Sequence, residues 1–108
     1  MIDFDLIEEK EEISFKGGVG SAFLKKQDDG LNRIMKIRLE QGSSIGLHRH
    51  EDSSEIIYIL SGKATVTTDG ITETVPSGCV SYCKKGSEHT VKNEEKSDLI
   101  FFAVVPMH

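Results

Sequence analysis

Apolar and polar residues alternate along most of this chain, in short segments separated by turn-forming residues. In residues 32–39, for example, Met35, Ile37 and Leu39 fall on one face and more polar side chains on the other. A period of two places alternate side chains on opposite faces of a β-strand. Similar alternating or β-branched segments occur at 55–60, 63–68, 71–75, 79–83, 89–92 and 98–105.

The turns between these segments favour antiparallel pairing. Asp69-Gly70 separates two alternating segments, and Asp29-Gly30 precedes residues 32–39. Such pairs suit tight hairpins because glycine accepts a positive φ. No segment carries an apolar stripe of helical period, and we interpret residues 1–12 as a charged N-terminal arm with room for one short helical turn. The sequence predicts an all-β fold, either a sandwich or a barrel of antiparallel strands.

The bulk properties limit the size and partners of the protein. A chain of 108 residues is expected to form a single domain, residues 1–108. A net charge of −5 argues against nucleic acid as a partner. No apolar run approaches the roughly 20 residues needed to span a bilayer, and the N-terminus lacks the pattern of a secretory signal. We therefore expect a soluble, cytoplasmic protein without membrane partners.

The two cysteines are expected to be free, buried thiols. Cys79 and Cys83 are four residues apart in a segment that is predicted to be a strand. Their Cα atoms would then lie about 13 Å apart, whereas a disulfide requires less than about 7 Å.

Three histidines and one glutamate form the strongest candidate site. His48 and His50 are two apart, so on a strand they project to the same face, and Glu55 opens the next segment. His89 follows Gly86 in a third segment. Imidazole and carboxylate together suit Fe, Mn, Ni or Zn. The pattern predicts that one divalent transition metal binds His48, His50, Glu55 and His89.

The surroundings of this site can be predicted in part. Ile57 and Ile59 share the face of Glu55 and are expected to line the pocket, whereas Tyr58 should point away. Gly42 and Gly46 are expected to let the chain turn sharply before His48. Lys84-Lys85 is interpreted as a solvated loop, or alternatively as a group near the barrel mouth that attracts anions. Asn93 is expected to form a turn, and the terminal His108 to be solvated.

Two stretches of the chain resemble the two motifs of the cupin superfamily. The first motif, residues 42–62, matches at Gly42, His48, His50, Glu55 and Gly62. The second, residues 78–93, matches at Gly78, Gly86, His89 and Asn93, but Lys84 stands where the family has proline. The fifteen-residue gap between the motifs is similar to that of small, single-domain microbial members. The resemblance implies a small double-stranded β-helix, or jelly-roll barrel, of two packed antiparallel sheets with the metal inside its mouth.

The resemblance also implies frequent homodimers, in which N-terminal strands extend the partner's sheet, but it does not fix a reaction. Our first hypothesis is a metal-dependent enzyme with dioxygenase, isomerase or lyase chemistry that acts on a small, anionic or metal-chelating organic molecule. A divalent metal bound to one carboxylate keeps roughly one positive charge, which favours anionic ligands. The alternative is a non-catalytic module that senses a sugar, an organic acid or the metal itself.

Overall fold

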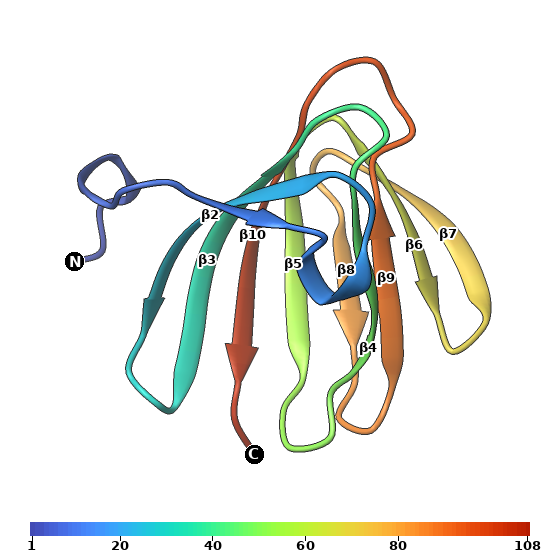
Figure 1. Cartoon of the computed structure of the whole chain (residues 1–108). Helices are drawn as coiled ribbons and strands as arrows, with labels where there is room; N and C mark the ends of the chain where they lie inside the picture. Colours follow the sequence, from blue (N-terminus) through green and yellow to red (C-terminus); the bar gives the residue numbers. More distant parts are fainter.

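The computed structural model describes residues 1–108, which form two antiparallel sheets packed face to face (Figure 1). One sheet has six strands in the order β1 (Lys10–Ile13), β2 (Ser21–Asp28), β3 (Asn32–Leu39), β10 (Leu99–Pro106), β5 (Glu55–Ser61) and β8 (Val80–Cys83). The other has four, in the order β4 (Ser44–Arg49), β9 (Glu88–Lys92), β6 (Lys63–Thr68) and β7 (Ile71–Pro76). This architecture confirms the predicted all-β barrel of two packed sheets. None of the helices is long and apolar enough to cross a membrane.

The core lies between the two sheets and follows the alternation in the sequence. Met35, Ile37 and Leu39 of β3 are buried, as their shared face predicts. Strand β10 alternates in the same way, with Phe101 and Ala103 fully buried. One contiguous cluster of 16 buried apolar residues joins both sheets, so a single core supports the barrel.

The two predicted hairpins form, with different loops. Asp69 and Gly70 have φ values of 48° and 82° and connect β6 to β7 directly, as a two-residue turn of the expected type requires. Between β2 and β3 the loop has a third residue, Leu31. Oδ1 of Asp29 accepts hydrogen bonds from the backbone N–H groups of Leu31 and Asn32 at 2.9 and 2.8 Å, and these bonds stabilise the longer loop.

The N-terminal arm has more structure than its composition indicates. A short 3₁₀ helix, η1 (Phe4–Leu6), is the one helical turn for which the sequence leaves room. Residues from Lys10 onward form β1, which pairs with β2 at one end of the six-stranded sheet (Figure 1). All four β1 residues are exposed, so apolar burial does not mark this strand in the sequence.

The structure corrects the expectation that both thiols are buried. Cys79 is exposed beside the end of β7, whereas Cys83 at the end of β8 is buried. Neither forms a disulfide. Burial raises the pKa of the Cys83 thiol to about 11, with a further contribution from the charge of Glu55, which pairs with Cys83 across β5 and β8. This thiol is therefore held in its unreactive, protonated form at neutral pH.

Gly46 has a different role from the predicted sharp turn. It lies inside β4, and a Cβ atom at this position would be 2.2 Å from the carbonyl oxygen of Lys16. Gly18 is packed equally closely, with its Cβ position 2.0 Å from the carbonyl oxygen of Ser44. These contacts bring the short 3₁₀ helix η2 (Phe15–Gly17) against β4. Gly42, in contrast, has a φ of +80° and forms the predicted turn before β4.

Candidate metal centre

Three separate segments bring the four predicted ligands together. His48 in β4 pairs directly with His89 in β9, so both side chains leave one sheet at the same level. Glu55 is the first residue of β5 in the facing sheet. His50 lies just beyond the end of β4, and its backbone N–H and carbonyl pair with Ser87 and Gly86 at 2.9 and 2.6 Å. This backbone pairing keeps His50 in an extended conformation, so its side chain projects to the same side as that of His48, two residues earlier.

The side-chain tips converge on one point between the sheets. Oε1 of Glu55 lies 3.1 Å from Nε2 of His50 and 2.9 Å from Nε2 of His89. Nε2 of His89 is also 3.1 Å from Nε2 of His50 and 3.1 Å from Nε2 of His48. The four ligand atoms all lie within 4.8 Å of one another. The structure therefore gathers every residue of the predicted site.

Hydrogen bonds at the far side of two rings orient the cluster. Nδ1 of His48 donates to the carbonyl of Gly46 at 2.7 Å, which leaves a lone pair on Nε2 facing the other ligands. Nδ1 of His50 is hydrogen-bonded to the hydroxyl of Ser53 at 3.0 Å. Such outer contacts fix the ring orientation of metal-binding histidines. Nδ1 of His89 is buried without a partner.

The arrangement fits a bound cation. Ligand atoms about 2.1 Å from a shared ion and at right angles to one another lie about 3.0 Å apart. Four of the contacts among the tips measure 2.9 to 3.1 Å. Burial acts to raise the pKa of Glu55, but the three surrounding histidines outweigh it and hold that pKa well below its ordinary value. The cluster thus combines an ionised, buried carboxylate with three imidazoles, the donor set that divalent transition metals prefer.

A pocket of about 190 Å³ opens onto this cluster, and we call it the metal pocket. Met35, Ile37 and Val105 contribute to its apolar wall. Ile57 and Ile59, predicted to line it, are instead buried in the core, because they lie farther along β5 from the cluster than Glu55 does. Other apolar wall residues are Phe15, Ile45, Val91 and Met107.

Three cationic side chains line the same pocket, namely Lys16, Arg33 and Arg49. Apart from the candidate ligands, no other titratable side chain does so. Lys84 and Lys85 are exposed, as expected of a solvated loop, and neither lines this pocket. Lys84 lines a different cavity, and Nζ of Lys85 donates to the carbonyl oxygen of His108 at 3.4 Å. Lys16 belongs to η2, which packs against β4. The local sequence pattern does not indicate this contact between distant segments.

The remaining predicted residues have structural roles. Asn93 is buried and forms a turn, where its Nδ2 donates to the carbonyls of Leu39 and Ser97 and its Oδ1 accepts from the Glu95 N–H. His108 is exposed, and its Nε2 is hydrogen-bonded to the Ser54 hydroxyl at 2.9 Å. Neither side chain lines the metal pocket. Tyr58 points out of the barrel, as predicted.

These features define a small two-sheet β-barrel protein with a three-histidine, one-carboxylate cluster in its mouth. The family model for the cupin domain matches residues 35–105, and the chain belongs to this family. An oxalate-binding protein of Thermotoga maritima is 34% identical over 93 residues, which cover 83% of this chain and 77% of that relative.

Solved structures agree with the family assignment. The crystal structure of a predicted oxalate decarboxylase from Thermotoga maritima matches with a TM-score of 0.94 and 27% identity, covering 100% of this chain and 99% of that one. A sugar phosphate isomerase of the cupin superfamily from Silicibacter pomeroyi matches with a TM-score of 0.82 and 18% identity, covering 100% and 76%. The latter likeness shows the fold alone.

Proposed function

We propose that the protein binds one divalent transition metal through His48, His50, Glu55 and His89, and that this centre holds a small chelating organic anion. The observation that carries the proposal is the convergence of four ligand atoms within 4.8 Å at the base of a pocket. Iron, manganese, nickel and zinc all suit this donor set. The bound metal would supply Lewis acidity and direct bonds to oxygen atoms of the ligand.

Oxalate is the first ligand to test. The metal pocket, at about 190 Å³, suits a molecule of a few heavy atoms. Lys16, Arg33 and Arg49 line its wall, and positive charge there favours an anion in a partly enclosed site. Arg33 and Arg49 are each paired with one carboxylate, of Asp28 and Glu88, whereas Lys16 has no ion-pair partner. The oxalate-binding relative from Thermotoga maritima supports the same choice. We propose ligand binding ahead of catalysis because the pocket is lined by no acidic or basic side chain besides the candidate metal ligands and these cations.

Metal-loaded protein is expected to bind oxalate, and chelator-treated protein to bind it at least about 100-fold more weakly. Direct bonding to a metal contributes several kcal/mol, and about 1.4 kcal/mol corresponds to each factor of ten. Isothermal titration calorimetry measures both affinities. Following the oxalate concentration and product formation in the same samples separates a binding module from an enzyme. Equal oxalate affinity with and without metal would refute the proposal.

We further propose that residues 1–108 form a single domain that associates as a homodimer through the outer face of the six-stranded sheet. Ile56 and Tyr58 point outward from β5 and are flanked in register by outward-facing residues of the two neighbouring strands. The flanking residues are Phe102 and Val104 of β10 and Val80 and Tyr82 of β8. A contiguous apolar patch of this kind is typical of an interface, and a twofold axis would cover both copies at once.

The Tyr58→Glu variant is expected to be monomeric at concentrations where the wild type is dimeric. A carboxylate at the centre of the patch would have to be buried without a partner, which costs several kcal/mol. Size-exclusion chromatography with light scattering measures the mass. The matched Thr74→Glu variant, on exposed β7 of the other sheet, should stay dimeric. A monomeric wild type would contradict this proposal without affecting the metal site.

A further inference from the structure

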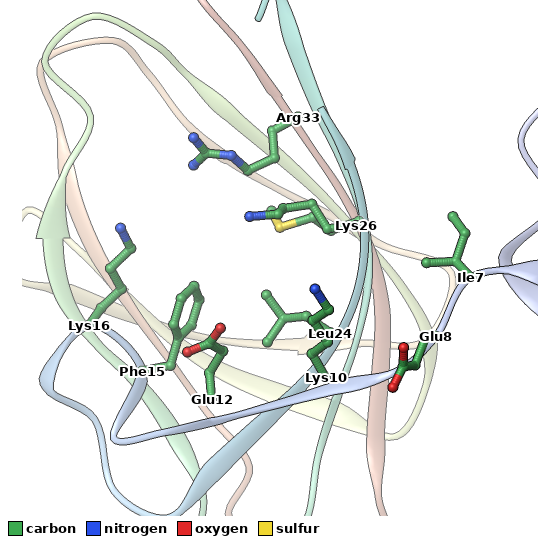
Figure 2. A pocket seen from close by; sticks show the side chains of 10 residues that line it. Ile7, Glu8, Lys10, Glu12, Phe15, Lys16, Leu24, Lys26 and Arg33 are labelled. Atoms are coloured by element: carbon green, nitrogen blue, oxygen red, sulfur yellow. The ribbon is translucent and has the colours of Figure 1, made fainter. Parts of the chain in front are cut away.

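A second and larger cavity lies beside the metal pocket. It has a volume of about 610 Å³ and is bounded by residues 7–16 on one side and by β2 and β3 on the other (Figure 2). The two spaces adjoin, because they share four lining residues, Phe15, Lys16, Arg33 and Met35. The larger cavity, which we call the outer subsite, exceeds what a ligand the size of oxalate would fill.

At the outer subsite, cationic side chains occupy the face of the six-stranded sheet that elsewhere faces the core. Leu24 and Lys26 are two apart on β2, so Lys26 continues the core-facing side of this strand. Lys26 pairs with Met35 of β3, and Lys10 of β1 pairs with Leu24. Figure 2 shows the ends of Lys10, Lys16, Lys26 and Arg33 turned toward the same hollow. A sheet usually places apolar side chains on this face.

Three of these four positive charges have no ion-pair partner within the protein. Lys10, Lys16 and Lys26 form no ion pair. Arg33 does form one: its Nε donates to Asp28 at 3.1 Å, so the three lysines carry the unpaired charge. The lining holds four of the 13 Lys and Arg residues but only two of the 18 Asp and Glu residues, Glu8 and Glu12. A local excess of positive charge in a protein of net charge −5 indicates a site for an anion.

We propose that the outer subsite binds a second anionic group, remote from the metal, on a ligand whose chelating end lies in the metal pocket. This inference rests on the proposed function and narrows its ligand class. The ligand would be a 2-oxo or 2-hydroxy acid that carries a carboxylate or a phosphate at its other end. Lys10 and Lys26 contact only that remote group, because they line the outer subsite but not the metal pocket. Lys16 and Arg33 line both spaces and lie at the junction.

Matched pairs of small acids test whether the outer subsite binds a remote anionic group while the metal pocket binds the chelating end. Pyruvate and 2-oxoglutarate share a chelating end, and only the second carries a remote carboxylate. Glycerate and 3-phosphoglycerate make the corresponding comparison for a remote phosphate. Calorimetry on the metal-loaded protein should show tighter binding of the longer member of at least one pair. The pair that shows the gain identifies whether carboxylate or phosphate is recognised, and equal affinities within both pairs would overturn the proposal.

The double variant Lys10→Gln/Lys26→Gln should remove that gain. We expect binding of the longer probe to weaken about tenfold, whereas oxalate and pyruvate affinities change less than about twofold. The control Lys25→Gln/Lys63→Gln removes two positive charges outside both cavities and should retain the gain. Equal loss in both double variants would show a general charge effect and refute the subsite. If oxalate and pyruvate fail to bind the wild-type protein, the proposed function is refuted rather than the subsite. The same series of titrations therefore distinguishes the two failures.

Discussion

The His50→Ala variant is expected to be purified with less than about a tenth of a metal ion per chain, whereas the wild type should carry close to one. Nε2 of His50 lies 3.1 Å from both Glu55 Oε1 and His89 Nε2, so this ring closes one side of the cluster. Changes to outer contacts of metal ligands already cost roughly 10–100-fold in affinity, and loss of a ligand should exceed that. Elemental analysis measures the metal content and identifies the metal.

Two further variants give this experiment its controls. His108→Ala removes a histidine outside the cluster and should leave the metal content unchanged. Ser53→Ala removes the hydrogen bond to Nδ1 of His50 but no ligand, and it should weaken metal binding by about 10–100-fold. Circular dichroism checks that each variant is folded. A folded His50→Ala protein with full metal content would show that this histidine is not a ligand.

The strands and the candidate site could be predicted because both depend on local spacing. Burial of alternate residues in β3 follows from a period of two, and the φ values of Asp69 and Gly70 follow from their residue types. His48 and His50 share a face for the same reason. Glu55 lies only five residues after His50, and the resemblance to a known motif then linked these residues to His89, which is distant in the chain.

The wall of the two cavities could not be predicted because it depends on contacts between distant segments. Residues 10–13 are all exposed and carry no apolar alternation, yet they pair with β2. Lys16 reaches the metal pocket only because η2 packs against β4. The local pattern wrongly placed Ile57 in the wall of the metal pocket, because this residue shares the face of Glu55 but is buried in the core.

The segment that carries Lys16 is held in an unusual conformation. Ser14 and Lys16 have φ values of 53° and 55°, in the left-handed region that residues other than glycine seldom adopt. Contacts with β4 compensate for this strain: the Val19 N–H donates to the Ser44 hydroxyl and the Ser44 N–H to the Val19 carbonyl, both at 2.9 Å. The shape of the metal pocket thus depends on the close approach of this segment to β4.

The Gly46→Ala variant is therefore expected to be less stable than the wild type by about 2–4 kcal/mol, with a Tm lower by roughly 10–20 °C. The added Cβ would lie 2.2 Å from the carbonyl oxygen of Lys16 and 2.7 Å from backbone atoms of Gly17 and Gly18, so backbone on one side must move. Thermal unfolding followed by circular dichroism measures the loss.

Gly30→Ala is the matched control for this prediction. Gly30 has a φ of +87° but no atom within 4 Å of its Cβ position, so alanine there adds backbone strain of about 1–2 kcal/mol without a collision. Gly46 has no positive φ, and its cost would come from the collision alone. A Tm for Gly46→Ala equal to or above that of Gly30→Ala would show that residues 16–18 can move away from β4 freely. Lys16 and Phe15 would then be mobile walls of the metal pocket rather than fixed ones.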